Sequence, residues 1–151
     1  MDRFSIVTVR ASLVWMLSGF VVGALMLVDR EIPGNWRQWL QPTHGHMLFV
    51  GWFVQFVIGI AYWLLPRKRN PERPLGYREA PAFAGAIMLN AGMILRAIGE
   101  PMERIGNAGG LSIGILALSG VLQVGAIVIF ISQIWPRIYG RNRMGAATAK
   151  S

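Results

Sequence analysis

Four apolar runs divide this sequence, and each of them is long enough to cross a lipid bilayer. They cover residues 11–28, 47–65, 80–98 and 109–135. A hydrocarbon core about 30 Å thick needs about 20 apolar residues in a helix. Because a helix satisfies its backbone polar groups within its own segment, a run of this length in lipid predicts a helix. We therefore expect an all-α protein, a bundle of four transmembrane helices in a lipid bilayer.

The composition supports a membrane protein and excludes several other classes. Of the 151 residues, 54% are hydrophobic and only 15% are charged, which is too apolar for a soluble domain. We expect one transmembrane domain over residues 1–138 and a basic, disordered tail over residues 139–151. The chain has no cysteine. This excludes disulfides, iron–sulfur clusters, thiolate-ligated or covalently attached haem, and cysteine nucleophiles.

Residues 1–10 and the apolar run after them have the layout of a secretory signal peptide. No small-x-small cleavage site followed by a polar mature region comes after the run. We therefore expect the first run to be retained as the first transmembrane helix.

The net charge of +8 is concentrated between and after the apolar runs, which indicates membrane topology rather than nucleic-acid binding. The connection after the second run has five basic residues against two acidic ones, and the C-terminal segment has basic residues only. By the positive-inside rule, both termini are expected to be cytoplasmic. Segment 29–43, with balanced charges and two tryptophans, is expected at the outer interface. We expect the membrane to be the bacterial cytoplasmic (inner) membrane.

The only two histidines, His44 and His46, stand at the start of the second run. Helical residues two apart point about 200° from one another, so the two imidazoles cannot easily bind one ion together. If the helix already winds at Thr43, they face opposite sides and each can serve a different site. The alternative is that both are solvated or cap the helix.

Below His44 the same helix face continues through Gly51 and Gln55. The missing side chain of Gly51, two turns inward, leaves room for a flat group such as a macrocycle. Alternatively, Gly51 and Gly59 are points of contact between helices.

The run His44-Gly45-His46-Met47-Leu48-Phe49-Val50-Gly51-Trp52, continuing to Gly59, Tyr62 and Pro66, resembles haem-ligating helices of the haem-copper oxidase and nitric oxide reductase catalytic subunit. In that family a histidine-glycine pair opens the second helix and ligates low-spin haem. A later helix carries a His-x-His pair that serves two haems. The resemblance covers about one helix in four, and it implies that His44 and His46 are ligands of the iron of haem b.

The departures from this family limit the activity that the resemblance implies. The family needs further histidines for copper and for the high-spin haem, and this chain has none left. We therefore expect no complete oxidase or reductase in this chain alone. What the resemblance implies is a cytochrome b-type protein for electron transfer, with a possible respiratory-chain partner.

Two arginines are further candidates for the site. Arg96 precedes Glu100 by four residues, which favours an ion pair along the helix or snorkelling to the interface. The alternative is a clamp on a haem propionate, because the related subunit has arginines near propionates on the same outer side, and Arg104 matches that placement loosely. The polar residues within the spans are expected to form hydrogen bonds between helices: Gln55, Asn90, Ser112, Ser119 and Gln123.

Because His44 and His46 lie back to back, six-coordinate iron requires one histidine from each of two chains. Such a contact is heterologous, and heterologous contacts either close into a ring or run on as a filament. The related subunit has three four-helix arcs, which suggests a homotrimer with haem at each subunit interface. The main rival is a two-fold dimer in which two His44 residues share one haem.

Two other functions stay open, namely a haem-free structural or assembly subunit of a respiratory complex and a gas-sensing haem protein.

Overall fold

A computed structural model describes residues 1–28, 34–66, 74–106 and 109–138 of the chain, and the regular elements in these ranges are all helices. Four helices are long and apolar enough to cross a membrane, as the sequence predicts. They are α1 (Arg3–Val28), a composite of α2 (Trp36–His46), η1 (Met47–Val54) and α3 (Gln55–Leu64), α4 (Glu79–Ile105), and α5 (Gly109–Ile134) with the short 3₁₀ turn η2 (Trp135–Arg137). The expected tail, 139–151, lies outside the described residues.

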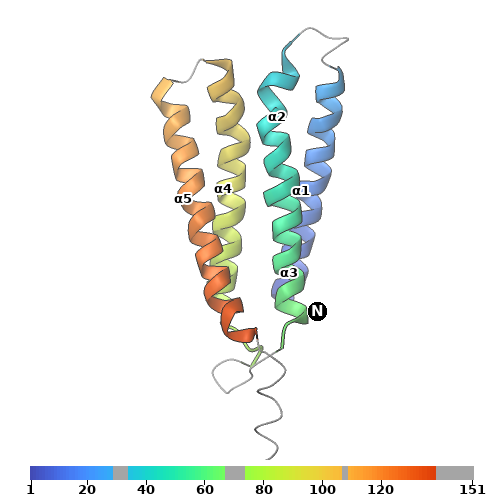
Figure 1. Cartoon of the computed structure of the whole chain (residues 1–151), viewed down its shortest axis with the longest axis vertical. Coiled ribbons are helices and arrows are strands. Elements are labelled where there is room, and N and C mark those ends of the chain that lie inside the picture. The colour runs from blue at the N-terminus through green and yellow to red at the C-terminus, as the bar shows by residue number, and fades with distance from the viewer. Residues whose placement is uncertain (29–33, 67–73, 107–108, 139–151) are drawn as a thin grey trace, which may run out of the picture.

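The four spans form two antiparallel hairpins (Figure 1). In one hairpin α1 packs along α2, η1 and α3, and in the other α4 packs along α5. The hairpins meet mainly where α2 packs on α4. The end of the bundle at which α2 begins and α4 ends is called the upper end, and it lies at the top of Figure 1.

Glycines allow the first hairpin to pack closely. A Cβ atom added at Gly51 would lie 2.7 Å from Cγ of Trp15, and one at Gly59 would lie 2.9 Å from Cγ2 of Val9. Both glycines are therefore contact points with α1, which confirms the helix-contact interpretation. The space beside Gly51, which the sequence suggested for a macrocycle, is occupied by the Trp15 indole.

Three helices extend further than the apolar runs, and α1 is one of them because it begins at Arg3 and not at residue 11. The second span begins at Trp36, so the expected connecting segment 29–43 is helical from Trp36 onward. Likewise, α4 continues to Ile105, so Glu100 belongs to the helix and not to the following loop. The runs underestimate the second span and α4 because polar residues of these turns, His46 and Glu100 among them, find partners inside the bundle.

Aromatic side chains fill the core at the lower end. The ring of Tyr62 lies 4.6 Å from that of Phe4 and 4.8 Å from that of Tyr77, measured between centroids, and Phe130 joins the same cluster. These rings come from α1, α3, α5 and the segment before α4, so they join all four spans.

The guanidinium of Arg137 closes the same end of the bundle. It donates hydrogen bonds to the carbonyl oxygens of Tyr62 (2.9 Å), Leu65 (2.7 Å) and Pro66 (3.2 Å), where α3 ends. The last carbonyls of a helix have no partner within the helix, so this side chain supplies it. Arg137 thereby joins the end of α5 to the end of α3.

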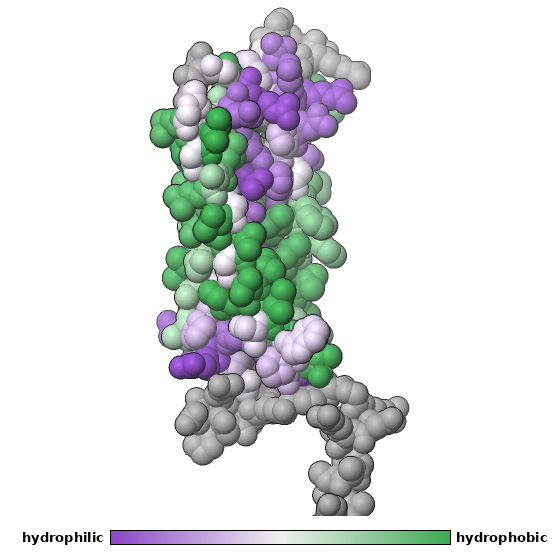
Figure 2. All heavy atoms as spheres, turned by 60° about the vertical axis from the view of Figure 1, so that its left-hand side comes forward, coloured by the Kyte–Doolittle hydropathy of each residue, from purple (hydrophilic) through white to green (hydrophobic). Residues whose placement is uncertain are grey.

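The outer surface fits a membrane environment. Figure 2 shows apolar side chains around the middle of the bundle and hydrophilic ones at its two ends. The large residues exposed on α1 and α5 are mainly apolar. This distribution supports an integral membrane protein, and the cytoplasmic placement of the termini stays a prediction.

Candidate functional site

The two histidines lie on opposite sides of α2, as their spacing predicts. Nδ1 of His44 is 2.9 Å from the carbonyl oxygen of Gly19 in α1. His46 instead points toward α4, where its ring meets Arg96 and Glu100. The two imidazoles therefore belong to two different environments.

The ring of His44 packs against two glycines of α1, Gly19 and Gly23. Its Nδ1 contacts the carbonyl of Gly19, and a Cβ added at Gly23 would come within 2.8 Å of its Cε1. Any side chain at position 23 would push the ring out. The sequence interpretation missed these two glycines, although a pair of small residues four apart in an apolar run is the usual signal for close helix contact.

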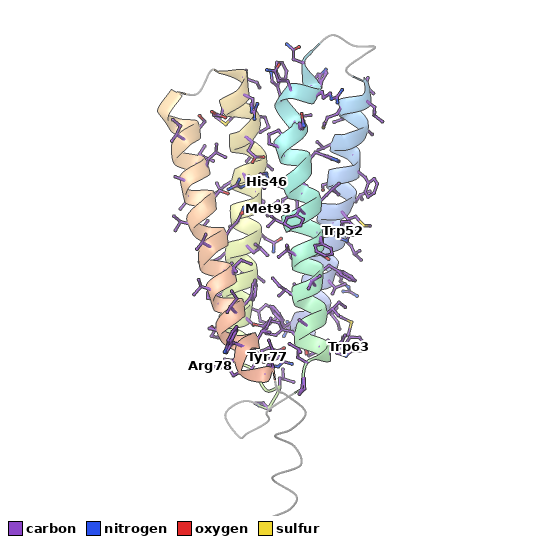
Figure 3. All side chains as sticks on the ribbon, viewed as in Figure 1. His46, Trp52, Trp63, Tyr77, Arg78 and Met93 are labelled. Atoms are coloured by element: carbon purple, nitrogen blue, oxygen red, sulfur yellow. The ribbon has the colours of Figure 1, made fainter. Side chains whose placement is uncertain are left out.

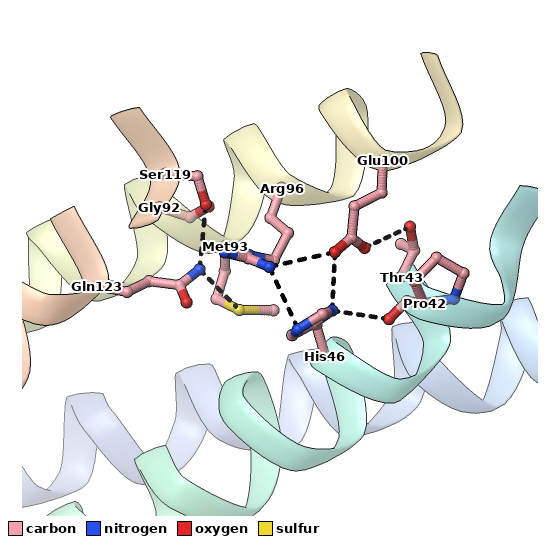
Figure 4. Close-up of polar contacts among 9 residues, drawn as sticks. All are labelled: Pro42, Thr43, His46, Gly92, Met93, Arg96, Glu100, Ser119 and Gln123. Atoms are coloured by element: carbon pink, nitrogen blue, oxygen red, sulfur yellow. Dashed lines mark hydrogen bonds and ion pairs between the residues drawn. The ribbon is translucent and has the colours of Figure 1, made fainter. Parts of the chain in front are cut away.

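His46 is part of a cluster of four polar side chains from α2 and α4 (Figure 4). We call Thr43, His46, Arg96 and Glu100 the Glu100 cluster. The carboxylate Oε1 lies 2.8 Å from Nδ1 of His46 and 3.3 Å from Nη1 of Arg96, while Oε2 accepts a hydrogen bond of 3.0 Å from Thr43. The predicted ion pair between Arg96 and Glu100 is thus present.

Burial makes these contacts necessary. The Glu100 side chain is only 8% exposed, against 22% for Arg96 and 36% for His46. A buried carboxylate is tolerated only when donors and a counter-charge compensate for its lost hydration. Thr43, His46 and Arg96 supply them, which explains why polar residues can stand at this depth of α2 and α4.

The hydrogen bonds of the two rings determine which nitrogen carries a proton. Nδ1 of His44 faces a carbonyl oxygen, and Nδ1 of His46 faces the carbonyl oxygen of Pro42 (2.9 Å) as well as Glu100. Oxygens of these kinds only accept, so Nδ1 is the donor in both rings. Arg96 brings Nη1, which only donates, to within 3.3 Å of Nε2 of His46, so this Nε2 presents its lone pair.

The remaining predicted site residues lie apart from the Glu100 cluster. Gln55 is fully buried on the side of its helix that faces α1, where its Nε2 is 3.5 Å from the carbonyl oxygen of Thr8. Arg104 is exposed in the last turn of α4 and forms none of the contacts of the cluster. Neither residue is brought next to His46.

Polar residues deeper in the bundle bond between helices, as expected. Ser119 donates to the carbonyl oxygen of Gly92 (2.8 Å), and Gln123 contacts Sδ of Met93 at 3.7 Å, just below the Glu100 cluster (Figure 4). The predicted bond of Asn90 is one of 2.8 Å that its Oδ1 accepts from the Trp15 indole, which joins α1 to α4. Ser112 departs from the prediction, because its hydroxyl donates to the carbonyl oxygen of Gly109 in its own helix.

Comparison with protein-family models, curated proteins and solved structures gave no match. Within the described residues, no group of three or more His, Cys, Asp or Glu side chains is arranged to hold a metal ion. The candidate site therefore consists of two separate imidazoles, each held by its own hydrogen bonds.

Proposed function

We propose that this chain is a membrane cytochrome b-type protein that holds the iron of haem b through Nε2 of His44 and of His46 and serves electron transfer. The observation that supports this most is that both rings direct Nδ1 toward an oxygen acceptor. Histidines that bind metals almost always donate their other ring N–H to a carboxylate or a backbone carbonyl. This contact fixes the tautomer and the ring plane and leaves Nε2 for the iron.

The residues fit a haem because each histidine is held through Nδ1 and would offer only its Nε2 to the iron, whose remaining ligands the porphyrin would supply. Each histidine is partly exposed and lies outside the fully buried core. At His46, ligation requires Arg96 to give up its 3.3 Å contact with Nε2. Arg96 would then be the residue to hold a haem propionate, since a guanidinium binds carboxylates in a fork.

When bound, haem supplies a one-electron couple. The chain's own groups set the environment of that couple. Glu100 places a negative charge beside His46, whereas His44 has a neutral carbonyl as its partner. His44 and His46 are the only histidines, so none is left to hold copper or a second type of haem. The proposed role is therefore to carry electrons, and a respiratory-chain partner would give or receive them.

For the assembly we propose a homotrimeric ring in which His44 of one chain and His46 of the next ligate one haem. The opposite directions of the two rings support this proposal, because one chain cannot place both on the two faces of one porphyrin. Native mass spectrometry is expected to give three chains with three haems. A dimer with one haem, or a monomer with a six-coordinate spectrum, would contradict the ring.

One observation favours a second function, a haem-free structural or assembly subunit. The Glu100 cluster joins α2 to α4 where the two hairpins meet, and His46 uses both ring nitrogens within it. That is what a purely structural histidine would do.

An absorbance spectrum of the purified protein separates these functions. Haem ligation predicts a Soret band and a reduced-minus-oxidised spectrum typical of bis-histidine haem b. Absence of haem, including after reconstitution with haemin, would refute the proposal and support the structural role. Carbon monoxide binding to the reduced protein would instead indicate an open axial position and a gas-sensing role.

A further inference from the structure

The second span and α5 leave an open groove along the side of the bundle, which we call the α5 groove. Two neighbouring cavities form it, an upper one of about 340 Å³ and a lower one of about 250 Å³, and both have Val54 and Ile127 in their walls. The upper cavity is lined by aliphatic side chains and by Gln123, whose Nε2 lies 3.7 Å from Sδ of Met93 and 3.3 Å from Oγ of Ser119. The groove exists because α3 and α5 make little contact, while α4 packs closely on α5 behind it.

The upper cavity begins one helical turn below His46. Val50 and Val54 follow His46 at intervals of four residues, so they continue its side of the helix, and both line the cavity. Opposite them, Leu89 of α4 lines the cavity seven residues before Arg96, on the same helix face as that arginine. The Glu100 cluster and the upper cavity therefore follow one another along one side of the bundle.

This is the side of the second span on which space remains. Toward α1, the Trp15 indole fills the place beside Gly51, so that place holds no further group. On the other side, Met93 lies just below His46 (Figure 3), and its Sδ contacts Gln123 of the cavity wall. The open space that a macrocycle needs is therefore found below His46.

The polarity of this side changes in the same direction as that of a haem, which has propionates on one edge and vinyl and methyl groups on the opposite edge. Arg96, 22% exposed, offers a guanidinium to carboxylates at the upper end. Below it, the aliphatic wall of the upper cavity suits the apolar edge. The cavity of about 340 Å³ is close to the smallest ligand pockets, about 300 Å³, which fits one edge of a macrocycle and not the whole.

We propose that the upper cavity seats the vinyl-bearing edge of the haem that His46 ligates, with the propionates above it at Arg96. Val50 and Val124, which line the upper cavity only, are then positioning residues that set how the macrocycle is turned about its bond to His46. The inference rests on the proposed function, because it requires haem at His46. A lipid acyl chain or a second copy of the protein would instead use both cavities, since the two share walls.

Filling each cavity separately tests the proposal, with haem binding measured by absorbance during reconstitution with haemin. Val124→Trp fills the upper cavity and is expected to weaken haem binding about tenfold by overpacking. Ile131→Trp fills the lower cavity only and is expected to bind haem as wild type does. Val121→Trp is the matched control, because Val121 is as exposed as Val124 (68% against 65%) and lines neither cavity.

The choice between haem analogues gives a second readout, which a folding defect does not change. Mesohaem has ethyl groups and haematohaem has hydroxyethyl groups in place of the vinyls, so an aliphatic seat is expected to favour mesohaem several-fold. Val124→Ser is expected to reduce this preference, and Val121→Ser is expected to leave it unchanged. If Val124→Trp does not fold, as judged by circular dichroism, this comparison decides.

Three results would overturn the proposal. These are equal haem binding by Val124→Trp and Val121→Trp, an equal loss in Val124→Trp and Ile131→Trp, and the same analogue preference in the two serine variants. The second result would indicate a lipid chain or a second copy along the whole groove. A wild type that takes up no haem would refute the proposed function and this inference with it, whereas a wild type that binds haem, with Val124→Trp unaffected, would refute the inference alone.

Discussion

His44 and His46 differ in the partner that holds each ring, and this difference determines their expected properties. A carboxylate partner makes an imidazole a stronger donor to iron than a backbone carbonyl does. His46 has Glu100 at 2.8 Å, whereas His44 has the carbonyl oxygen of Gly19 at 2.9 Å. The two proposed ligands therefore differ chemically in their surroundings although they are the same amino acid.

Glu100→Gln is expected to raise the midpoint potential of the haem while the low-spin spectrum stays in place. The negative charge of Glu100 favours the ferric state, and glutamine removes that charge while keeping an oxygen near Nδ1 of His46. A redox titration followed by absorbance measures the shift. Glu103→Gln, an exposed glutamate of the same helix, is the control. An unchanged potential in Glu100→Gln would show that His46 does not hold the iron.

Gly23→Ala is expected to displace the His44 ring, because its new Cβ would lie 2.8 Å from Cε1. Overpacking of this kind costs about 1 to 3 kcal/mol of unfolding free energy. Titration with sodium dodecyl sulfate in mixed micelles measures it. Gly45→Ala is the control, since a Cβ there meets nothing within 4 Å. Equal stability of the two variants would contradict the packing of His44 on α1.

At the scale of elements, apolar length predicted the number of spans and their approximate centres. It underestimated α1, α2 and α4, because a polar turn that buries its side chains in the bundle looks like a loop in the sequence. The opposite directions of the two histidines were predictable from helix geometry alone. The contact between Glu100 and His46 could not be predicted from the sequence, because it depends on the register of two helices that are far apart in the chain.

Arg137→Leu is expected to separate the lower ends of α3 and α5. It removes the donors to three carbonyl oxygens at the end of α3 and leaves them without that side chain's hydrogen bonds. The expected loss is about 3 kcal/mol of unfolding free energy. Arg104→Leu, at an exposed position, is expected to change it by less than about 0.5 kcal/mol. Similar values for both variants would refute the role of Arg137 as a helix cap.

At the scale of the whole molecule, the charge pattern makes a prediction that the fold leaves open. The lower end should face the cytoplasm, and the end with His44 and His46 should face outward. Because the chain has no cysteine, single cysteines report on this without background. In intact cells, Gln38→Cys, exposed in the first turn of α2, should react with an impermeant thiol reagent, and Asn70→Cys should not. The reverse pattern would invert the topology.

The central claim is that both histidines hold haem iron, and the haem content of single histidine variants tests it most directly. Wild type and Gly45→Ala, whose added Cβ has open space, are expected to contain one haem per chain with a low-spin spectrum. His44→Ala and His46→Ala are each expected to lose that spectrum, since no other histidine exists. If the chains form a ring, mixing the two variants should restore part of the low-spin spectrum, because some interfaces then contain both an intact His44 and an intact His46. Retention of the wild-type spectrum in both single variants would contradict the claim.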